Sequence, residues 1–205
     1  MHSTAADPPT GPWTFDPVRL GAHECGAWVG YYRRDWLLVL RSAVGMVKVG
    51  FGMGRLATLL GAWWVLRANR VWAPYPDNDP DRAREYMRRF YAMVVRSRGL
   101  AIDPAEAARR EVLWWREHRV LQRERTDADE AALVTALADL YAYVYGRPVQ
   151  DMLEPARDRA LAMRVSDLWV ADGCSLEDPR VAEERRLLVR SYARLLDVVG
   201  QHGAG

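Results

Sequence analysis

One helical stretch places two chemically active side chains on its apolar side. In the segment 104–122, Glu111 and His118 lie two helical turns apart. They share that side with Ala107, Ala108, Trp114, Trp115 and Leu121. A carboxylate in such a position must be hydrogen-bonded, paired with a cation or bound to a metal ion, because unpaired burial costs several kcal/mol. The segment therefore predicts an internal polar site.

Two further segments show the same anomaly. Asp167 interrupts an apolar line in the segment 153–172, and Glu24 precedes Trp28 and Tyr31 at helical spacing in the segment 17–35. Carboxylates and a histidine inside a helical bundle are typical of iron and manganese sites. The four ligands that we predict are Glu24, Glu111, His118 and Asp167. Glu-x-x-His does not occur in the sequence, so the pattern supports one metal ion or a carboxylate-rich pair.

The function that follows from this hypothesis is a metal-dependent oxidoreductase, with iron or manganese as cofactor, acting on a small and partly apolar molecule. The side chains predicted to form its substrate pocket are Trp28, Tyr31, Asn69, Trp114 and Trp115. Core packing is an alternative explanation for the aromatic side chains, since aromatic stripes at helical spacing are common in bundles.

The buried polar side chains also have explanations without a metal. Glu111 could pair with an inward arginine such as Arg33 or Arg67, and His118 could be a neutral core histidine. Asp167 could cap the end of a neighbouring helix. Acid–base catalysis by Glu111 and His118 without a metal is a further alternative.

A basic stripe suggests a different class of function. Arg34, Arg41, Lys48 and Arg55 recur every seven residues within an apolar segment. On one helix this spacing keeps side chains close to a line, with a drift of about 20° per step. The stripe is either the exposed edge of a nearly buried helix or a surface for anionic lipid, a partner protein or an acidic ligand. The rival function is therefore a non-catalytic binding or adaptor protein, with peripheral membrane contact through this stripe.

Composition narrows the classes of protein further. The 205 residues carry 29 Lys and Arg against 27 Asp and Glu, and this near balance argues against a nucleic-acid-binding protein. Two cysteines are too few for a disulfide scaffold. The N-terminus lacks the features of a secretory signal, and the apolar run 56–66 is too short to span a bilayer. We therefore expect a cytoplasmic protein without a transmembrane segment.

The helix-start signals in the sequence predict an all-α fold. Asp-Pro pairs at positions 16–17, 79–80, 103–104 and 178–179 are typical helix starts, and alternating strand patterns are almost absent. The helices that we expect span 17–35, 36–52, 54–73, 80–99, 104–122, 127–145, 153–172 and 179–199, and glycines leave open whether the first two form one bent helix. We predict a single-domain bundle of seven to eight helices over 16–200, with a flexible arm at 1–15 and a frayed tail at 201–205.

Overall fold

The computed structural model describes residues 13–124 and 126–200, and every secondary-structure element in these ranges is helical. The elements are α1 (Pro17–Tyr32), α2 (Trp36–Phe51), α3 (Arg55–Trp72), α4 (Pro80–Arg98), α5 (Pro104–Glu124), α6 (Asp127–Tyr145), the 3-10 helix η1 (Val149–Met152), α7 (Leu153–Ala171) and α8 (Pro179–Gly200). The predicted all-α bundle is confirmed, and most predicted helix ends lie within two or three residues of the observed ones.

The helices begin where the sequence supplies side-chain acceptors. Asp16 and Asp79 cap α1 and α4, and each is followed by proline. Thr126 and Asp129 form a reciprocal capping box at the start of α6. Glu106, which stands at the matching position of α5, instead accepts hydrogen bonds from Arg109 and Arg110.

The first two helices are separate, and the break redistributes the basic stripe. Arg34 takes a left-handed conformation with φ of 60°, and Asp35 then caps α2 by accepting from the backbone N–H of Leu38. Helix α2 ends at Gly52, also left-handed, and Arg55 is the first residue of α3. The expectation that Arg34, Arg41, Lys48 and Arg55 share one helix is therefore wrong: Arg41 and Lys48 lie on α2, but Arg34 precedes that helix and Arg55 begins the next one.

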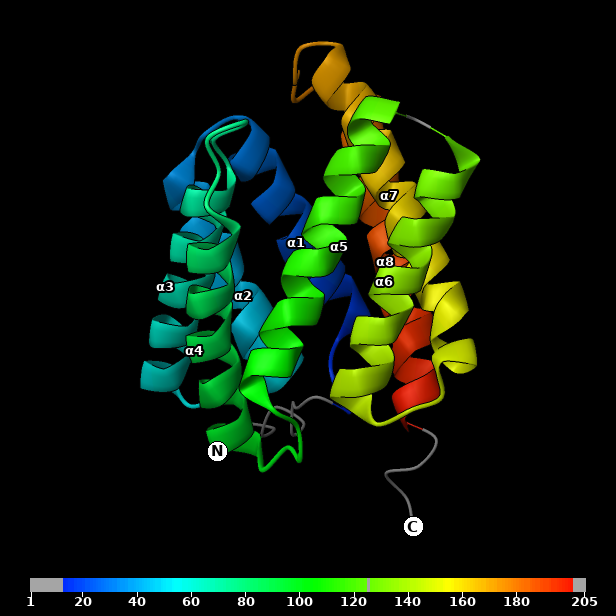
Figure 1. Cartoon of the computed structure of the whole chain (residues 1–205). Coiled ribbons are helices and arrows are strands. Elements are labelled where there is room, and N and C mark those ends of the chain that lie inside the picture. The colour runs from blue at the N-terminus through cyan, green and yellow to red at the C-terminus, as the bar shows by residue number, and fades with distance from the viewer. Residues whose placement is uncertain (1–12, 125, 201–205) are drawn as a thin grey trace, which may run out of the picture.

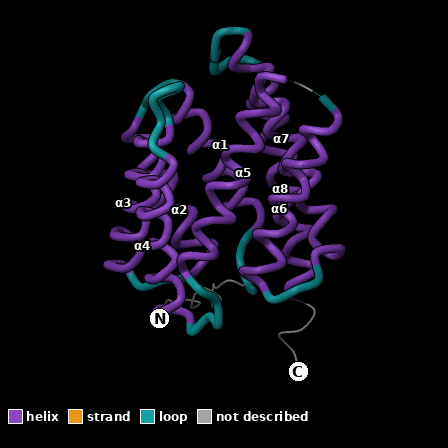
Figure 2. The backbone as a smooth tube through the Cα atoms, in the orientation of Figure 1, coloured by secondary structure: helices purple, strands orange, loops and turns teal. Residues whose placement is uncertain are grey.

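The eight α-helices form a closed ring. Each packs against the helix before it and the helix after it in the sequence, and α8 returns to pack against α1 (Figure 1). Short loops join most neighbours around the ring (Figure 2). This arrangement turns one face of every helix toward a common interior, which the α1–α8 contact closes.

The core extends to residues that the sequence did not place in it. Phe15, assigned to the flexible arm, is buried and meets the ring of Tyr192 edge-on at 6.0 Å. A smaller second core cluster lies between α1, α7 and α8 and includes Cys25, Trp169 and Leu188. Residues 1–12 of the predicted arm at 1–15, and the predicted tail at 201–205, lie outside the described residues.

Candidate functional site

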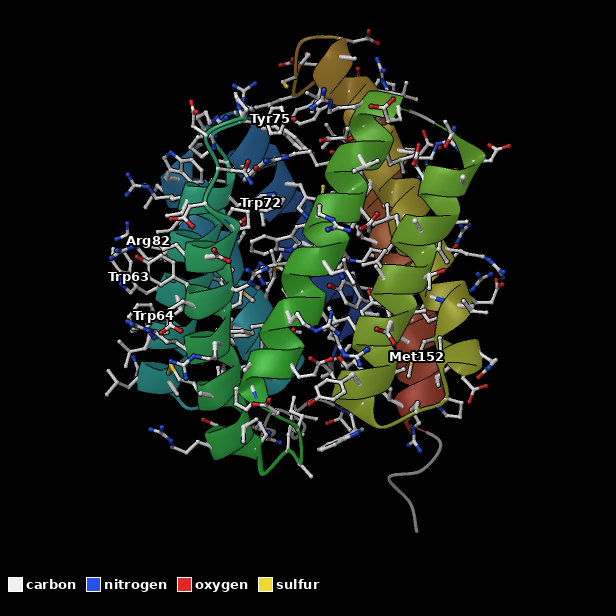
Figure 3. The ribbon with its side chains drawn as sticks, in the orientation of Figure 1. Trp63, Trp64, Trp72, Tyr75, Arg82 and Met152 are labelled. Atoms are coloured by element: carbon white, nitrogen blue, oxygen red, sulfur yellow. The ribbon has the colours of Figure 1, made fainter. Side chains whose placement is uncertain are left out.

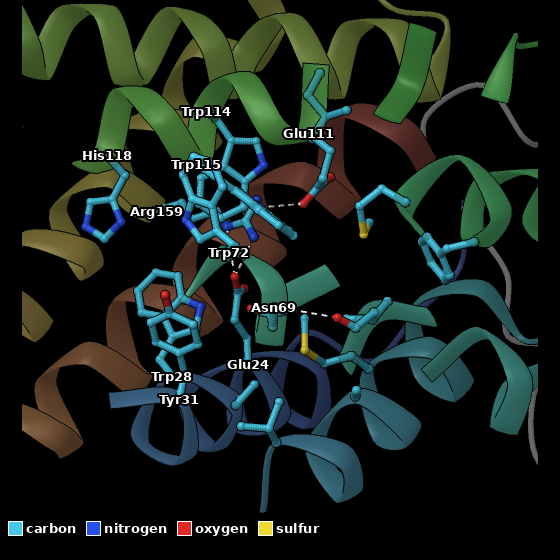
Figure 4. Close-up of a pocket in the computed structure, with 18 of the residues that line it drawn as sticks. Glu24, Trp28, Tyr31, Asn69, Trp72, Glu111, Trp114, Trp115, His118 and Arg159 are labelled. Carbon is cyan, nitrogen blue, oxygen red and sulfur yellow. Dashed lines mark hydrogen bonds and ion pairs between the residues drawn. The ribbon is translucent and has the colours of Figure 1, made fainter. Parts of the chain in front are cut away.

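The interior of the ring contains a chamber of about 470 Å³. Side chains from all eight α-helices line it, and many of them are aromatic (Figure 4). The aromatic lining residues are Trp28, Tyr31, Tyr32, Phe51, Trp72, Tyr75, Phe90, Tyr91, Trp114, Trp115, Tyr141, Tyr145 and Tyr192. The exposed residues among those lining the chamber are Arg34, Tyr75 and Arg123, so the chamber opens to solvent beside them.

A buried ion pair forms one wall of the chamber. Arg159 of α7 donates to one oxygen of Glu24, from Nη2 at 2.5 Å and from Nε at 2.9 Å. The hydroxyl of Tyr192 donates to the other oxygen at 2.5 Å, and the Arg159 guanidinium lies 4.6 Å from the ring centre of Trp114. Glu24 is thus satisfied by protein groups, as a fully buried carboxylate requires.

Glu111 forms a separate polar group on α5. Its carboxyl accepts from the Tyr91 hydroxyl at 2.8 Å and from the Trp115 indole at 3.2 Å. Burial raises the pKa of Glu111, while the positive charge of Arg159 and these hydrogen bonds oppose the increase. Because the side chain also lines the chamber, it offers a polar contact to anything inside.

His118 and Asp167 form a third group. The Nε2 atom of His118 lies 3.2 Å from Asp167, and Gln122 donates to the other oxygen of Asp167 at 2.5 Å. The imidazole lines the chamber and stacks on Trp28, with 6.5 Å between the ring centres. Asp167 is not among the lining residues, so it holds His118 from behind.

The predicted metal site is therefore wrong. Its four ligands fall into three separate hydrogen-bonded groups, and no cluster of His, Cys, Asp and Glu among the described residues could hold a metal ion. The physical reason is that Arg159, tyrosine hydroxyls and an indole supply the compensation that we had assigned to iron or manganese. The metal-dependent oxidoreductase inferred from that site loses its basis.

The sequence also misassigned the inward arginine. Arg33 donates to the backbone oxygen of Cys174, and Arg67 donates to the hydroxyl of Tyr86, so neither pairs with Glu111. Arg159 escaped notice although it lies between Ala156 and Met163 on the apolar line of its helix. That spacing is the signal that could have found it.

All five predicted pocket residues line the chamber: Trp28, Tyr31, Asn69, Trp114 and Trp115. Asn69 donates to the backbone oxygen of Val65 at 3.0 Å, which fixes the orientation of its amide. Three helices, α1, α3 and α5, thus bring these side chains together (Figure 4). Their contact with a substrate stays a prediction.

Arginines surround the mouth of the chamber, and the sequence analysis missed this feature. Arg119 lies 4.5 Å from the ring centre of Trp72 and 5.2 Å from that of Tyr75. It donates to the backbone oxygen of Trp72 at 3.1 Å, while its Nη1 atom is buried without a hydrogen-bond partner in the described chain. Helical periodicity alone places Arg119 on a different side of α5 from Glu111 and His118, but the ring of Tyr75, from the loop 73–79, lies beside it.

No protein-family model, curated protein or solved structure matches this chain. Within the described residues, no helix is long and apolar enough to cross a membrane.

Proposed function

We propose that this protein binds a small organic molecule with an apolar, ring-containing body inside the chamber. The observation that carries the proposal is the chamber itself. Its volume of about 470 Å³ lies within the range of small-molecule sites, which are concave, largely apolar and equipped with a few fixed polar groups. The aromatic walls match that description.

The energetics of packing support an occupant. Protein interiors are normally filled to crystal-like density, and an empty cavity forfeits dispersion contacts along its whole lining. Flat rings such as Trp28 and Trp115 offer faces against which another ring can stack, at a gain of about 0.5–1.5 kcal/mol for each aromatic pair. A ligand that contains an aromatic ring would restore the dispersion contacts that the lining of an empty chamber lacks.

The polar groups of the chamber give such a ligand an orientation. Glu24 and Arg159 satisfy each other, so they require no charge from the ligand. Glu111 on α5 and the amide of Asn69 on α3 also reach the chamber. A hydroxyl or amine on the ligand would be recognised by these two side chains.

Titration with N-phenyl-1-naphthylamine, a neutral fluorescent probe that joins a naphthalene and a phenyl ring, tests the proposal. We expect saturable fluorescence enhancement at one probe per chain. Ala27→Phe places a ring inside the chamber and should abolish the enhancement. Ala182→Phe adds the same ring at an exposed position of α8 and should leave it intact. Absence of binding to the unmodified protein, or equal binding by both variants, would overturn the proposal.

We also propose a second function, peripheral contact with an anionic membrane, because α3 exposes an apolar face. Leu56, Leu59, Leu60 and Trp63 are 73 %, 55 %, 47 % and 40 % exposed. Their spacing places them on one side of the helix. Trp63 projects outward from the edge of the bundle (Figure 3). An apolar helix face left open to solvent is typical of an interaction surface.

The charge of α3 and of the segments that flank it in the sequence favours lipid as the partner. Residues 36–76 contain five basic side chains and no Asp or Glu: Arg41, Lys48, Arg55, Arg67 and Arg70. Anionic lipid headgroups attract such a surface while leucine and tryptophan side chains enter the acyl boundary. Pairing of two identical copies through this face would instead bring like charges together.

Co-sedimentation with vesicles tests the membrane contact. We expect binding to vesicles of phosphatidylserine and phosphatidylcholine, weaker binding at higher salt, and none to phosphatidylcholine alone. The double variant Leu56→Gln/Leu60→Gln should lose binding. The control Leu161→Gln/Leu168→Gln, which changes two exposed leucines of α7, should retain it. Equal and negligible binding to both kinds of vesicle would remove this function.

A further inference from the structure

A second hollow adjoins the chamber. It is a surface groove of about 630 Å³ between the start of α4 and the outer side of α5. The two hollows share four lining residues: Trp72, Tyr75, Arg119 and Arg123. The groove therefore continues the mouth of the chamber along the surface of the molecule.

The groove is strongly basic. Five arginines line it, Arg84, Arg109, Arg116, Arg119 and Arg123, against one carboxylate, Glu124. Three of these arginines form ion pairs with neighbours: Arg84 with Asp81, Arg109 with Glu106, and Arg116 with Glu117. Arg119 and Arg123 form no ion pair with any carboxylate of the described chain. Arg119 and Arg123, the two groove arginines without a carboxylate partner among the described residues, lie where the groove meets the chamber.

Arg119 is held in place before any ligand arrives. Its guanidinium packs against the rings of both Trp72 and Tyr75, and its Nη2 atom donates to the backbone oxygen of Trp72. The Nη1 atom remains buried and without a hydrogen-bond partner among the described residues. A half-buried cation with an unused donor is costly, and an oxyanion relieves that cost by a charge-assisted hydrogen bond.

Arg123 supplies the second donor. Its side chain is exposed and bonds to the hydroxyl of Tyr75, with the guanidinium 5.1 Å from the centre of that ring. Arg119 and Arg123 lie one turn apart on α5, so both guanidinium groups face the same junction.

We infer that this junction binds an oxyanion carried by the ligand of the chamber. The ligand is then an amphipathic organic anion: its ring-containing body occupies the chamber, and its carboxylate, sulfonate or phosphate meets Arg119 and Arg123. This inference rests on the proposed small-molecule function, and it specifies the chemical class of the ligand.

Two probes that share a ring framework test the inference. 8-Anilinonaphthalene-1-sulfonate carries a sulfonate that N-phenyl-1-naphthylamine lacks. We expect the anionic probe to bind about tenfold more tightly, since hydrogen bonds to charged groups contribute about 1.5–3 kcal/mol. Arg119→Met keeps an unbranched side chain over Trp72 and should remove most of that advantage while the neutral probe binds as before.

Two further variants separate the outcomes. Arg123→Met changes an exposed side chain and is expected to preserve the fold. Like Arg119→Met, it should weaken binding of the anionic probe. Arg109→Met removes a groove arginine that is already paired with Glu106 and should affect neither probe.

Equal affinities for the two probes, with Arg119→Met and Arg123→Met both silent, would overturn the inference and leave the chamber proposal standing. Failure of both probes to bind would overturn both. Binding of the anionic probe that survives Ala27→Phe would also overturn the inference, because the oxyanion would then be bound without its body in the chamber.

Discussion

Two regions of this protein each bury a glutamate completely, and they treat it in opposite ways. Beside the chamber, Glu24 receives hydrogen bonds from Arg159 and Tyr192. Glu184 lies beside the second core cluster, next to Ser166 and Cys25, and forms no ion pair within the described chain. Burial raises the pKa of Glu184 to about 8. Glu24 is thus paired with a cation, whereas the raised pKa of Glu184 favours its neutral form.

The difference shows that burial of a carboxyl group does not by itself mark a functional site. Glu24 faces a hollow that can admit a ligand. Glu184 has no exposed surface, lies beside Ser166 and Cys25, and does not line the chamber. The combination of a charge pair with a hollow distinguishes the chamber from the second cluster.

Removal of the cation beside Glu24 is expected to have the largest effect on stability. Arg159→Met leaves a buried carboxylate without its partner, which costs about 3–5 kcal/mol of unfolding free energy at neutral pH. Urea denaturation measures the loss. Arg157→Met, which breaks an exposed pair with Glu154, should cost about 0.5 kcal/mol or less. The double variant Glu24→Gln/Arg159→Met should recover part of the loss, and failure to recover any would show that the pair is not the cause.

Neutralisation of the other glutamate is expected to stabilise the protein. The folded-state pKa of Glu184 lies above its usual value of 4.5. Between pH 4.5 and about 8 the carboxyl therefore ionises in the unfolded chain but not in the folded protein, and the free energy of unfolding falls as pH rises. Glu184→Gln removes this term and should gain about 2–4 kcal/mol at pH 8 and almost nothing at pH 4.5. Thermal unfolding measures the stability difference between variant and unmodified protein across this pH range. The control Glu183→Gln, at an exposed neighbouring position, should show no dependence of that difference on pH. A destabilised Glu184→Gln at pH 8 would contradict the contrast with Glu24.

A third variant tests the pair formed by His118 and Asp167. His118 lines the chamber and contacts Asp167, which keeps its hydrogen bond from Gln122 when the imidazole is removed. His118→Ala should therefore cost only about 1 kcal/mol. Equilibrium denaturation of His118→Ala and Arg159→Met under the same conditions compares their losses of unfolding free energy. A loss equal to that of Arg159→Met would mean that His118, rather than the ion pair, is the main polar support of the chamber.

Local signals in the sequence predicted the helices well. Proline after an aspartate cap starts α1 and α4, and glycine in the left-handed conformation ends α2, α4 and α6. Helical periodicity also placed Glu24, Glu111 and His118 toward the interior, where all three line the chamber. Such features depend on residues close in sequence, so they can be read without the fold.

The partners of these side chains could not be predicted in the same way. Glu24 and Arg159 are 135 residues apart, and they meet because α8 closes the ring against α1 and brings α7 with it. Periodicity places Arg119 on the outer side of its own helix, yet Trp72 and Tyr75, from another part of the chain, lie against it. Periodicity gives the direction of a side chain relative to its helix, and the fold decides what stands opposite.

The most direct test of a ligand-binding chamber is a crystal structure of the protein with 8-anilinonaphthalene-1-sulfonate. We predict the naphthalene ring inside the chamber, in contact with Trp28 or Trp115, and the sulfonate within hydrogen-bond distance of Arg119. The probe bound on the outer face of α3 beside Leu56 and Trp63, with the chamber filled by rearranged protein side chains, would contradict the account.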